Sequence, residues 1–110
     1  MLKKGPAKKV TIYINEDSRH HLQPLYEVIL THLLHNGVAG ATATRAMAGF
    51  GPHRVMHTTK IELLTEHLPI RIEFIETEEK VNELMATLLD MITDGLIEIQ
   101  DTTIVKSAME

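Results

Sequence analysis

The chain contains no cysteine, which excludes disulfide scaffolds, thiolate zinc sites and cysteine nucleophiles. No apolar run approaches about 18 residues, the length at which a membrane-spanning helix becomes a candidate. The first residues also lack the apolar stretch of a secretory signal. We therefore expect a cytoplasmic protein.

Basic charge is scarce as well. The 11 Lys and Arg residues are outnumbered by 15 Asp and Glu residues, so the formal net charge is −4 with neutral histidines. Nucleic-acid binding draws most of its affinity from a basic surface, so we expect no nucleic-acid partner. At 110 residues the chain has room for one domain. We place that domain at residues 8–106, between a disordered N-terminal tail at residues 1–7 and a C-terminal tail at residues 107–110.

Alternating apolar and polar residues predict strands with one buried face. The pattern is clear in Lys9–Asn15 and in Leu68–Glu76. A further strand is expected over Ala41–Ala48, and a last one over Leu96–Ile99 and Thr102–Lys106 with an interruption between its two parts. The apolar residues expected on the buried face of the first two strands are Val10, Ile12, Ile14, Ile70, Ile72 and Phe74.

Two helices are predicted from apolar stripes at helical spacing. The first has Pro24 in its first turn and stops at Gly37, which can adopt the left-handed cap conformation. The second begins at the N-cap residue Thr77 and continues to about Thr93. A single helical turn is also expected at Ile61–Leu64. The stripe residues are Leu22, Leu25, Tyr26, Val28, Ile29 and Leu33 in the first helix, and Val81, Leu84, Met85, Leu88, Met91 and Ile92 in the second.

The order of these elements is strand–helix–strand, repeated once. It predicts an α+β, ferredoxin-like βαββαβ fold, in which both helices cover one face of a four-stranded antiparallel sheet. The other face is left without a cover and is a natural subunit interface. It carries Thr11, Tyr13, Arg71, Glu73 and Ile75.

The most informative segment is Gly37–Gly51, which reads GVAGATATRAMAGFG. Its small side chains let another molecule approach the backbone, and Thr42 could pair with the edge of a base. The same small side chains would also suit an edge strand that packs against a neighbouring subunit. Gly49–Gly51 can be a flexible turn, or its free N–H groups can form a concavity that binds an anion.

In this arrangement the chain resembles the PII superfamily, and in particular the small PII-like proteins of bacteria and archaea. The resemblance extends from about residue 8 to residue 106. It implies a homotrimer whose ligand clefts lie between neighbouring subunits and take an adenine nucleotide. The segments that carry it are Gly37–Thr42, Gly49–Gly51, His57-Thr58, Leu68–Glu73, Glu79–Val81 and Asp94–Ile97.

The resemblance also implies that Thr42 serves the adenine end of the cleft and that a loop at residues 49–67 reports the ligand to a partner, with a membrane transporter or channel as one candidate. This loop is shorter than that of PII, and the turn Thr93–Leu96 lacks the glycine-rich, lysine-bearing phosphate loop of PII. We therefore expect AMP, ADP or ATP without triphosphate specificity. Arg45 and Arg71 are added as phosphate partners because strands hold them rigidly. The predicted nucleotide-binding residues are Gly40, Ala41, Thr42, Arg45, Gly49, Phe50, Gly51, His57 and Arg71.

Seven histidines raise the alternative of a metal-handling or structural trimer, similar to the copper-tolerance relatives of the same architecture. His32 and His35 are three residues apart, and His53 and His57 are four apart, but two imidazoles do not complete a tetrahedral site. We predict no metal. No nucleophile elbow or paired-carboxylate motif is recognisable, so we expect a binding protein rather than an enzyme. The third hypothesis, which we rank last, is a small enzyme that acts on a nucleotide.

Overall fold

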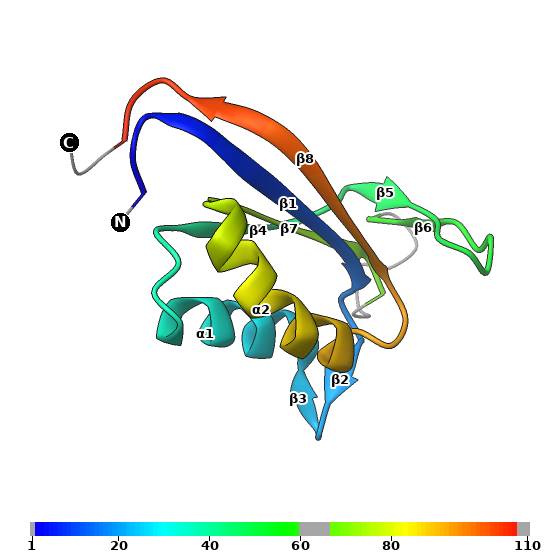
Figure 1. Ribbon diagram of the computed structural model, residues 1–110. Helices are drawn as coiled ribbons and strands as arrows, with labels where there is room; N and C mark the ends of the chain where they lie inside the picture. Colours follow the sequence, from blue (N-terminus) through cyan, green and yellow to red (C-terminus); the bar gives the residue numbers. More distant parts are fainter. Residues whose placement is uncertain (1, 60–66, 108–110) are drawn as a thin grey trace.

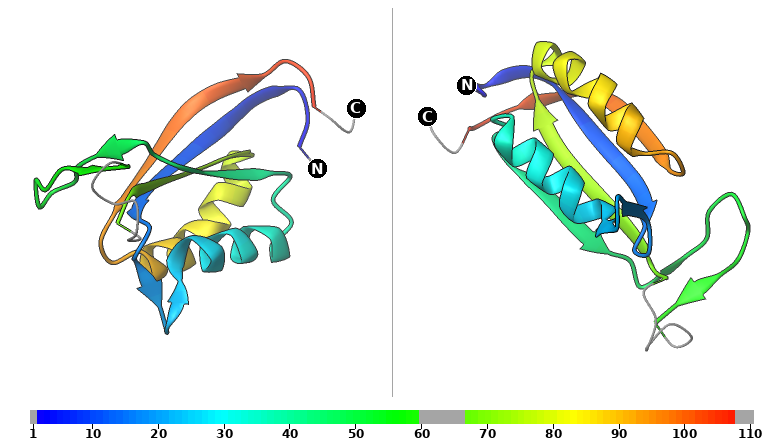
Figure 2. Two further views of the ribbon diagram at one scale, coloured as in Figure 1. Left: turned by 180° about the vertical axis from the view of Figure 1, so that it is seen from behind. Right: turned by 90° about the horizontal axis from the view of Figure 1, so that it is seen from below.

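The computed structural model describes residues 2–59 and 67–107. Two helices lie side by side on one face of a four-stranded antiparallel sheet, as Figures 1 and 2 show. The strand order is β4-β7-β1-β8. This is the α+β ferredoxin-like arrangement that the sequence predicts, and the expectation is confirmed. The trimer stays a prediction, and the helical turn expected at Ile61–Leu64 lies outside the described residues.

The two central strands form the floor of the core. Strand β1 (Gly5–Asn15) and strand β7 (Pro69–Glu76) are antiparallel, and Ile12 lies opposite Ile72. Both isoleucines are fully buried, as are their neighbours on the same face. The predicted inward faces of these strands are thus confirmed. The core cluster consists of Val10, Ile12, Ile14, Leu25, Ile29, Leu33, Ile70, Ile72, Phe74, Val81, Leu84, Leu88 and Ile92.

Strand β1 begins earlier than predicted. Gly5 pairs with Ile104 and Ala7 with Thr102, so residues 5–7 belong to the sheet and not to a disordered tail. Strand β8 (Leu96–Ile104) is long enough to pair with them, and Ala7 is buried beside it. Pairing between two distant segments extends the strand into residues that have no strand pattern of their own.

Strand β8 is also continuous, whereas an interruption at Gln100-Asp101 was expected. That prediction is wrong because β8 is an edge strand, where polar side chains meet water and do not have to be buried. Asp101 lies opposite Lys8 in β1 and forms a salt bridge with it. Gln100 pairs in the same ladder with Lys9.

Helix α1 (Leu25–His35) starts later than the predicted stripe. Leu22 is 96% exposed and has a φ of 74°, because it lies in the turn between two short strands, β2 (Arg19–His20) and β3 (Gln23–Pro24). Its assignment to the apolar stripe is therefore wrong.

The predicted helix boundaries at Gly37 and Thr77 are confirmed. Gly37 follows the C-cap of α1 with a φ of 76°. Thr77 caps helix α2 (Glu78–Met91), and its Oγ1 accepts a hydrogen bond of 3.1 Å from the backbone N–H of Lys80. Neither helix is long and apolar enough to cross a membrane, within the part of the chain that the structure describes.

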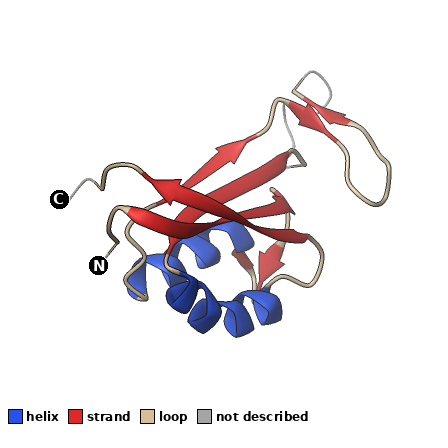
Figure 3. Cartoon of the chain, turned by 45° about the horizontal axis from the view of Figure 1, so that its top comes forward, coloured by secondary structure: helices blue, strands red, loops and turns tan. Residues whose placement is uncertain are grey.

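Strand β4 (Ala41–Arg45) is shorter than the predicted Ala41–Ala48. After Arg45 the chain leaves the sheet, and strands β5 (Ala48–Gly49) and β6 (His57–Thr58) pair with each other instead. Figures 1 and 3 show this hairpin extending from the body beyond the sheet. We call residues 46–59 the arm.

The N-cap of α2 can be tested by replacing Thr77 with Ala. Loss of the bond to the Lys80 N–H should lower the free energy of unfolding by about 1 kcal/mol. Urea denaturation followed by circular dichroism measures this change. Thr87→Ala is the matched control, since Thr87 is exposed within the same helix and alanine is a better helix former there. Equal stability of the Thr77→Ala variant and the wild type would contradict the cap.

Candidate functional site

Six of the nine predicted nucleotide-binding residues line two separate hollows. The first, which we call the β4 hollow, has a volume of about 570 Å³ and contains Gly40, Ala41 and Thr42. It lies at the start of β4, the end of β7 and the end of β8. Its lining is completed by Leu2, Lys9, Ala39, Glu73, Phe74, Ile75, Ile104, Lys106 and Ser107.

The second, which we call the loop hollow, has a volume of about 540 Å³ and contains Phe50, Gly51 and His57. It lies between the arm and the opposite end of the sheet, where β1 ends and β8 begins. The same chain therefore holds the two sets of predicted residues at opposite ends of its strands. The other lining residues are Tyr13, Ile14, Asn15, Pro52, His53, Val55, Pro69, Asp94, Gly95, Leu96 and Glu98.

The lining of the β4 hollow combines residues with small side chains and residues with charged side chains. Thr42 lies opposite Glu73 in the β4–β7 ladder, on the face of the sheet that carries no helix. A Cβ atom added at Gly40 would meet nothing within 4 Å, so there is open space beside the start of β4. Lys9 and Lys106 add positive charge to the lining. Backbone groups, a hydroxyl and ammonium groups are suited to a polar, anionic ligand.

Glu73 is held by two cations. Its Oε1 lies 3.3 Å from Lys9 Nζ and 3.0 Å from an Arg71 guanidinium nitrogen. Burial acts to raise the pKa of Glu73, but the hydrogen bond from Lys9 and the charges of Arg71 and Lys9 outweigh it and lower the pKa from its usual 4.5. A lowered carboxyl pKa stabilises the fold at neutral pH, and this contribution is lost as the pH falls below 4.5 through the folded-state pKa.

The arm has a defined turn at its tip. The N–H of Arg54 donates to the carbonyl of Gly51 at 2.9 Å, and Arg54 has a φ of 59°. The Arg54 guanidinium lies 5.8 Å from the centre of the Phe50 ring, within the range of a cation–π contact. Phe50 and Gly51 are thereby presented to the loop hollow from an ordered turn.

Two histidines connect the arm and its return to the body. His53 Nε2 lies 3.7 Å from Asp94 Oδ2, across the loop hollow. His67 Nδ1 lies 3.1 Å from Asp17 Oδ2, and the His67 ring is 6.0 Å from that of His57. His53, Asp94 and His57 line the loop hollow, so a ligand there would lie next to the contact of His53 with Asp94.

The other three predicted residues, Gly49, Arg45 and Arg71, line neither hollow. Gly49 lies against Pro69 at the edge of the loop hollow, since an added Cβ would come within 3.0 Å of Pro69 Cγ. Arg45 Nε forms a 2.9 Å salt bridge with Glu16, and Arg71 pairs with Glu73. Both arginines neutralise carboxylates of the same chain.

Sequence reasoning did not select the body side of the loop hollow as ligand-binding. Asp94 and Gly95 were interpreted as a helix stop and as part of the family resemblance, but they also line this hollow. Tyr13 was assigned to the uncovered sheet face and contributes to the same lining. The pairing of β1 with β8 brings Tyr13 beside Gly95, and the arm supplies the opposite side of the hollow.

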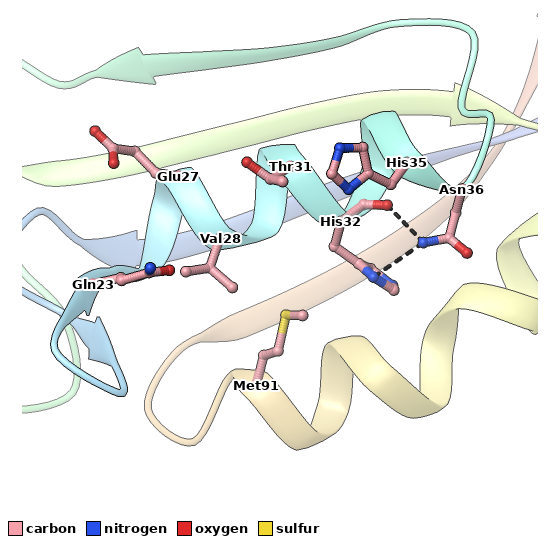
Figure 4. A pocket seen from close by; sticks show the side chains of 8 residues that line it. All are labelled: Gln23, Glu27, Val28, Thr31, His32, His35, Asn36 and Met91. Atoms are coloured by element: carbon pink, nitrogen blue, oxygen red, sulfur yellow. Dashed lines mark hydrogen bonds between the residues drawn. The ribbon is translucent and has the colours of Figure 1, made fainter.

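A third hollow of about 620 Å³ lies between the two helices, as Figure 4 shows. Its lining includes His32 and His35, the helical pair that raised the metal alternative. Asn36 Nδ2 lies 3.1 Å from His32 Nδ1 and donates to it, so a neutral His32 carries its proton on Nε2. That Nε2 is buried without a hydrogen-bond partner. Residues 2–59 and 67–107 contain no group of three His, Asp or Glu side chains that could hold a metal ion.

Gly95 can be tested by replacement with Ala. A Cβ atom there would come within 2.6 Å of the Tyr13 carbonyl oxygen and 3.0 Å of Ile14 Cγ2, so the backbone must move. We expect a loss of about 1–3 kcal/mol in the free energy of unfolding, measured by urea denaturation. Gly51→Ala is the control in the same hollow, since its Cβ would meet nothing within 4 Å. Equal stability of both variants would show that the close approach is not required.

Comparison with known proteins is consistent with this fold. The chain is 30% identical over 98 residues to a UPF0166 protein of Aquifex aeolicus, covering 89% of this chain and 92% of that protein. Among solved structures, it is similar to CPII of Thiomonas intermedia K12, a nitrogen regulatory PII-like protein bound to ADP, AMP and bicarbonate. The TM-score is 0.68 at 22% identity, over 90% of this chain and 88% of CPII.

A more distant likeness is to CutA of Synechococcus elongatus, with a TM-score of 0.58 at 11% identity over 97% of this chain and 88% of CutA. At such identities both structural likenesses show the fold alone. The model of the DUF190 family, described as Uncharacterized ACR, matches residues 7–104. The chain therefore belongs to the DUF190 family, and it shares the fold of the PII-like protein CPII.

Proposed function

We propose that the protein is a PII-like regulator that binds an adenine nucleotide between the subunits of a homotrimer. The observation that carries the proposal is the division of the predicted site between the β4 hollow and the loop hollow. In β1, Lys9 lines one hollow and Ile14 the other, and five residues of strand span about 17 Å. A neighbouring subunit that places its β4 hollow against the loop hollow completes the site, and repetition of this contact closes a ring.

The chemistry of each half suits one part of the ligand. In the β4 hollow, the Thr42 hydroxyl and the backbone of Gly40 and Ala41 are available to the edge of a base. In the loop hollow, the backbone of Gly51 and the side chain of His57 line the space that we assign to the phosphate. The adenine nucleotides bound to CPII, which shares this fold, support the choice of ligand.

We further propose that the loop of residues 49–67, which shares residues 49–59 with the arm, reports the ligand to a partner protein, with a membrane transporter or channel as one candidate. A ligand shifts the arm only if it binds one of two arm states more tightly. The contact of His53 with Asp94 lies across the loop hollow, where a bound phosphate would compete with the carboxylate for the imidazole. We place the protein among binding proteins rather than enzymes.

Isothermal titration with AMP, ADP, ATP and cyclic AMP tests the ligand. At least one adenine nucleotide should bind, and Thr42→Val should weaken its affinity about threefold to tenfold because a hydrogen bond is lost. Thr44→Val is the matched control, since Thr44 lies two residues along the same strand face and lines neither hollow. Absence of heat and of a thermal shift with all four nucleotides would exclude the proposal.

The subunit number tests the composite site separately. Light scattering after size-exclusion chromatography should give the mass of three chains of 12.4 kDa. Stable monomers that still bind the nucleotide would show that one chain forms the whole site, and the trimeric site would then be rejected.

The rival function is a metal-handling or structural trimer. It rests on the two histidines of the arm, His53 and His57, and on the likeness in fold to CutA. Metal analysis of protein purified without a histidine tag distinguishes the two. Stoichiometric zinc or copper, lost when either histidine is replaced, would favour the rival.

A further inference from the structure

The connection between α1 and β4 has few side chains of its own to fix it. It includes Gly37, Ala39 and Gly40, and Ala39 and Gly40 are exposed. Only Val38 packs against the core from this connection. Yet Ala39 and Gly40 line the β4 hollow together with Ala41 and Thr42. The position of their backbone must therefore be set by other parts of the chain.

Glu76 supplies the first such contact. Its Oε2 accepts a hydrogen bond of 2.8 Å from the backbone N–H of Ala39. Its Oε1 lies 3.4 Å from the N–H of Thr77, which also donates to it. Glu76 is only 5% exposed and is the last residue of β7. Burial of a carboxylate raises the free energy of the folded state unless the carboxylate is hydrogen-bonded. The two bonds from backbone N–H groups offset this cost for Glu76.

Lys80 supplies the second contact. Its Nζ donates a hydrogen bond of 3.0 Å to the carbonyl of Asn36, at the other end of the same connection. The backbone of Lys80 is fixed by the N-cap of α2, because its N–H donates to Thr77 Oγ1. The end of β7 thus holds Ala39, and the first turn of α2 holds Asn36.

Glu76 lies on the helix side of the sheet, three positions after Glu73, which faces the other side and lines the β4 hollow. Glu76 is not among the residues that line the hollow, so we expect a ligand there to contact Ala39 and not the Glu76 carboxylate. The effect of Glu76 on a ligand has to act through the backbone of Ala39 and the residues that follow it.

We propose that Glu76 is a positioning residue of the ligand site: its buried carboxylate fixes the Ala39 N–H and so pre-organises Gly40–Thr42. This inference rests on the proposed binding of an adenine nucleotide in the β4 hollow. A segment that is held in its bound conformation does not lose further freedom when the ligand binds, and its affinity is higher for that reason.

Three variants test the proposal, with ADP as the probe. Glu76→Leu removes both acceptors and leaves the Ala39 N–H unpaired, so ADP affinity should fall about tenfold. Glu76→Gln keeps an acceptor oxygen and should bind within about threefold of the wild type. Glu79→Gln is the control, because Glu79 is exposed in the first turn of α2. Isothermal titration gives the affinities.

Amide hydrogen exchange of the ligand-free proteins provides a second readout that does not depend on binding. In Glu76→Leu the amides of residues 37–42 should exchange faster, while those of β1 and the rest of β7 keep their protection. Unchanged exchange at residues 37–42 would show that the Glu76 carboxylate does not fix this segment. Faster exchange with unchanged ADP affinity would overturn its role in positioning the ligand.

Two further outcomes of the binding and exchange experiments also decide the proposal. If the wild type does not bind ADP or any other adenine nucleotide, the proposed function fails, and hydrogen exchange alone decides whether Glu76 holds the connection. If Glu76→Leu does not fold, Glu76→Met replaces it, since an unbranched side chain of similar length also removes both acceptor oxygens. Faster exchange at residues 37–42 and weaker ADP binding are then expected, and wild-type values of both would reject the proposal.

Discussion

Burial of the isoleucine face of β1 and β7 under the two helices is the constraint on which the rest of the structure depends. Ile12 and Ile72 lie opposite each other with no exposed surface. A shift of one residue in this ladder would turn every apolar side chain of the strand to the wrong face. The register is therefore fixed, and with it the residues that face away from the helices, including Glu73 and Thr42.

A rigid sheet also explains why the two hollows stay apart. Strands β1, β7 and β8 each contribute residues to both hollows, at opposite ends. No rearrangement within one subunit can bring the ends of a paired strand together. The proposed site thus depends on contact between subunits. In this proposal Glu76 acts on the half at the β4 hollow, and the arm at residues 46–59 acts on the half at the loop hollow.

Local patterns predicted most of the fold and part of the site. The alternation in β7, the N-cap at Thr77 and the stop at Gly37 are visible within a few residues, because each is a property of neighbouring side chains or of a single φ angle. One wrong prediction falls on a local turn and another on a strand whose partner is distant. Leu22 has the spacing of a stripe but lies in a turn, and β8 continues through polar residues because β1 pairs with them.

The sequence by itself determined the fold class and the segment of small residues around Thr42, because periodicity and side-chain size are properties of adjacent residues. Only the tertiary structure decided that the predicted ligand residues fall into two hollows, and that Arg45 and Arg71 are paired with carboxylates. It also decided the bond from Ala39 to Glu76, 37 residues away. Hydrogen bonds and ion pairs form wherever the chain brings donor and acceptor within about 3 Å, and no local pattern records that distance.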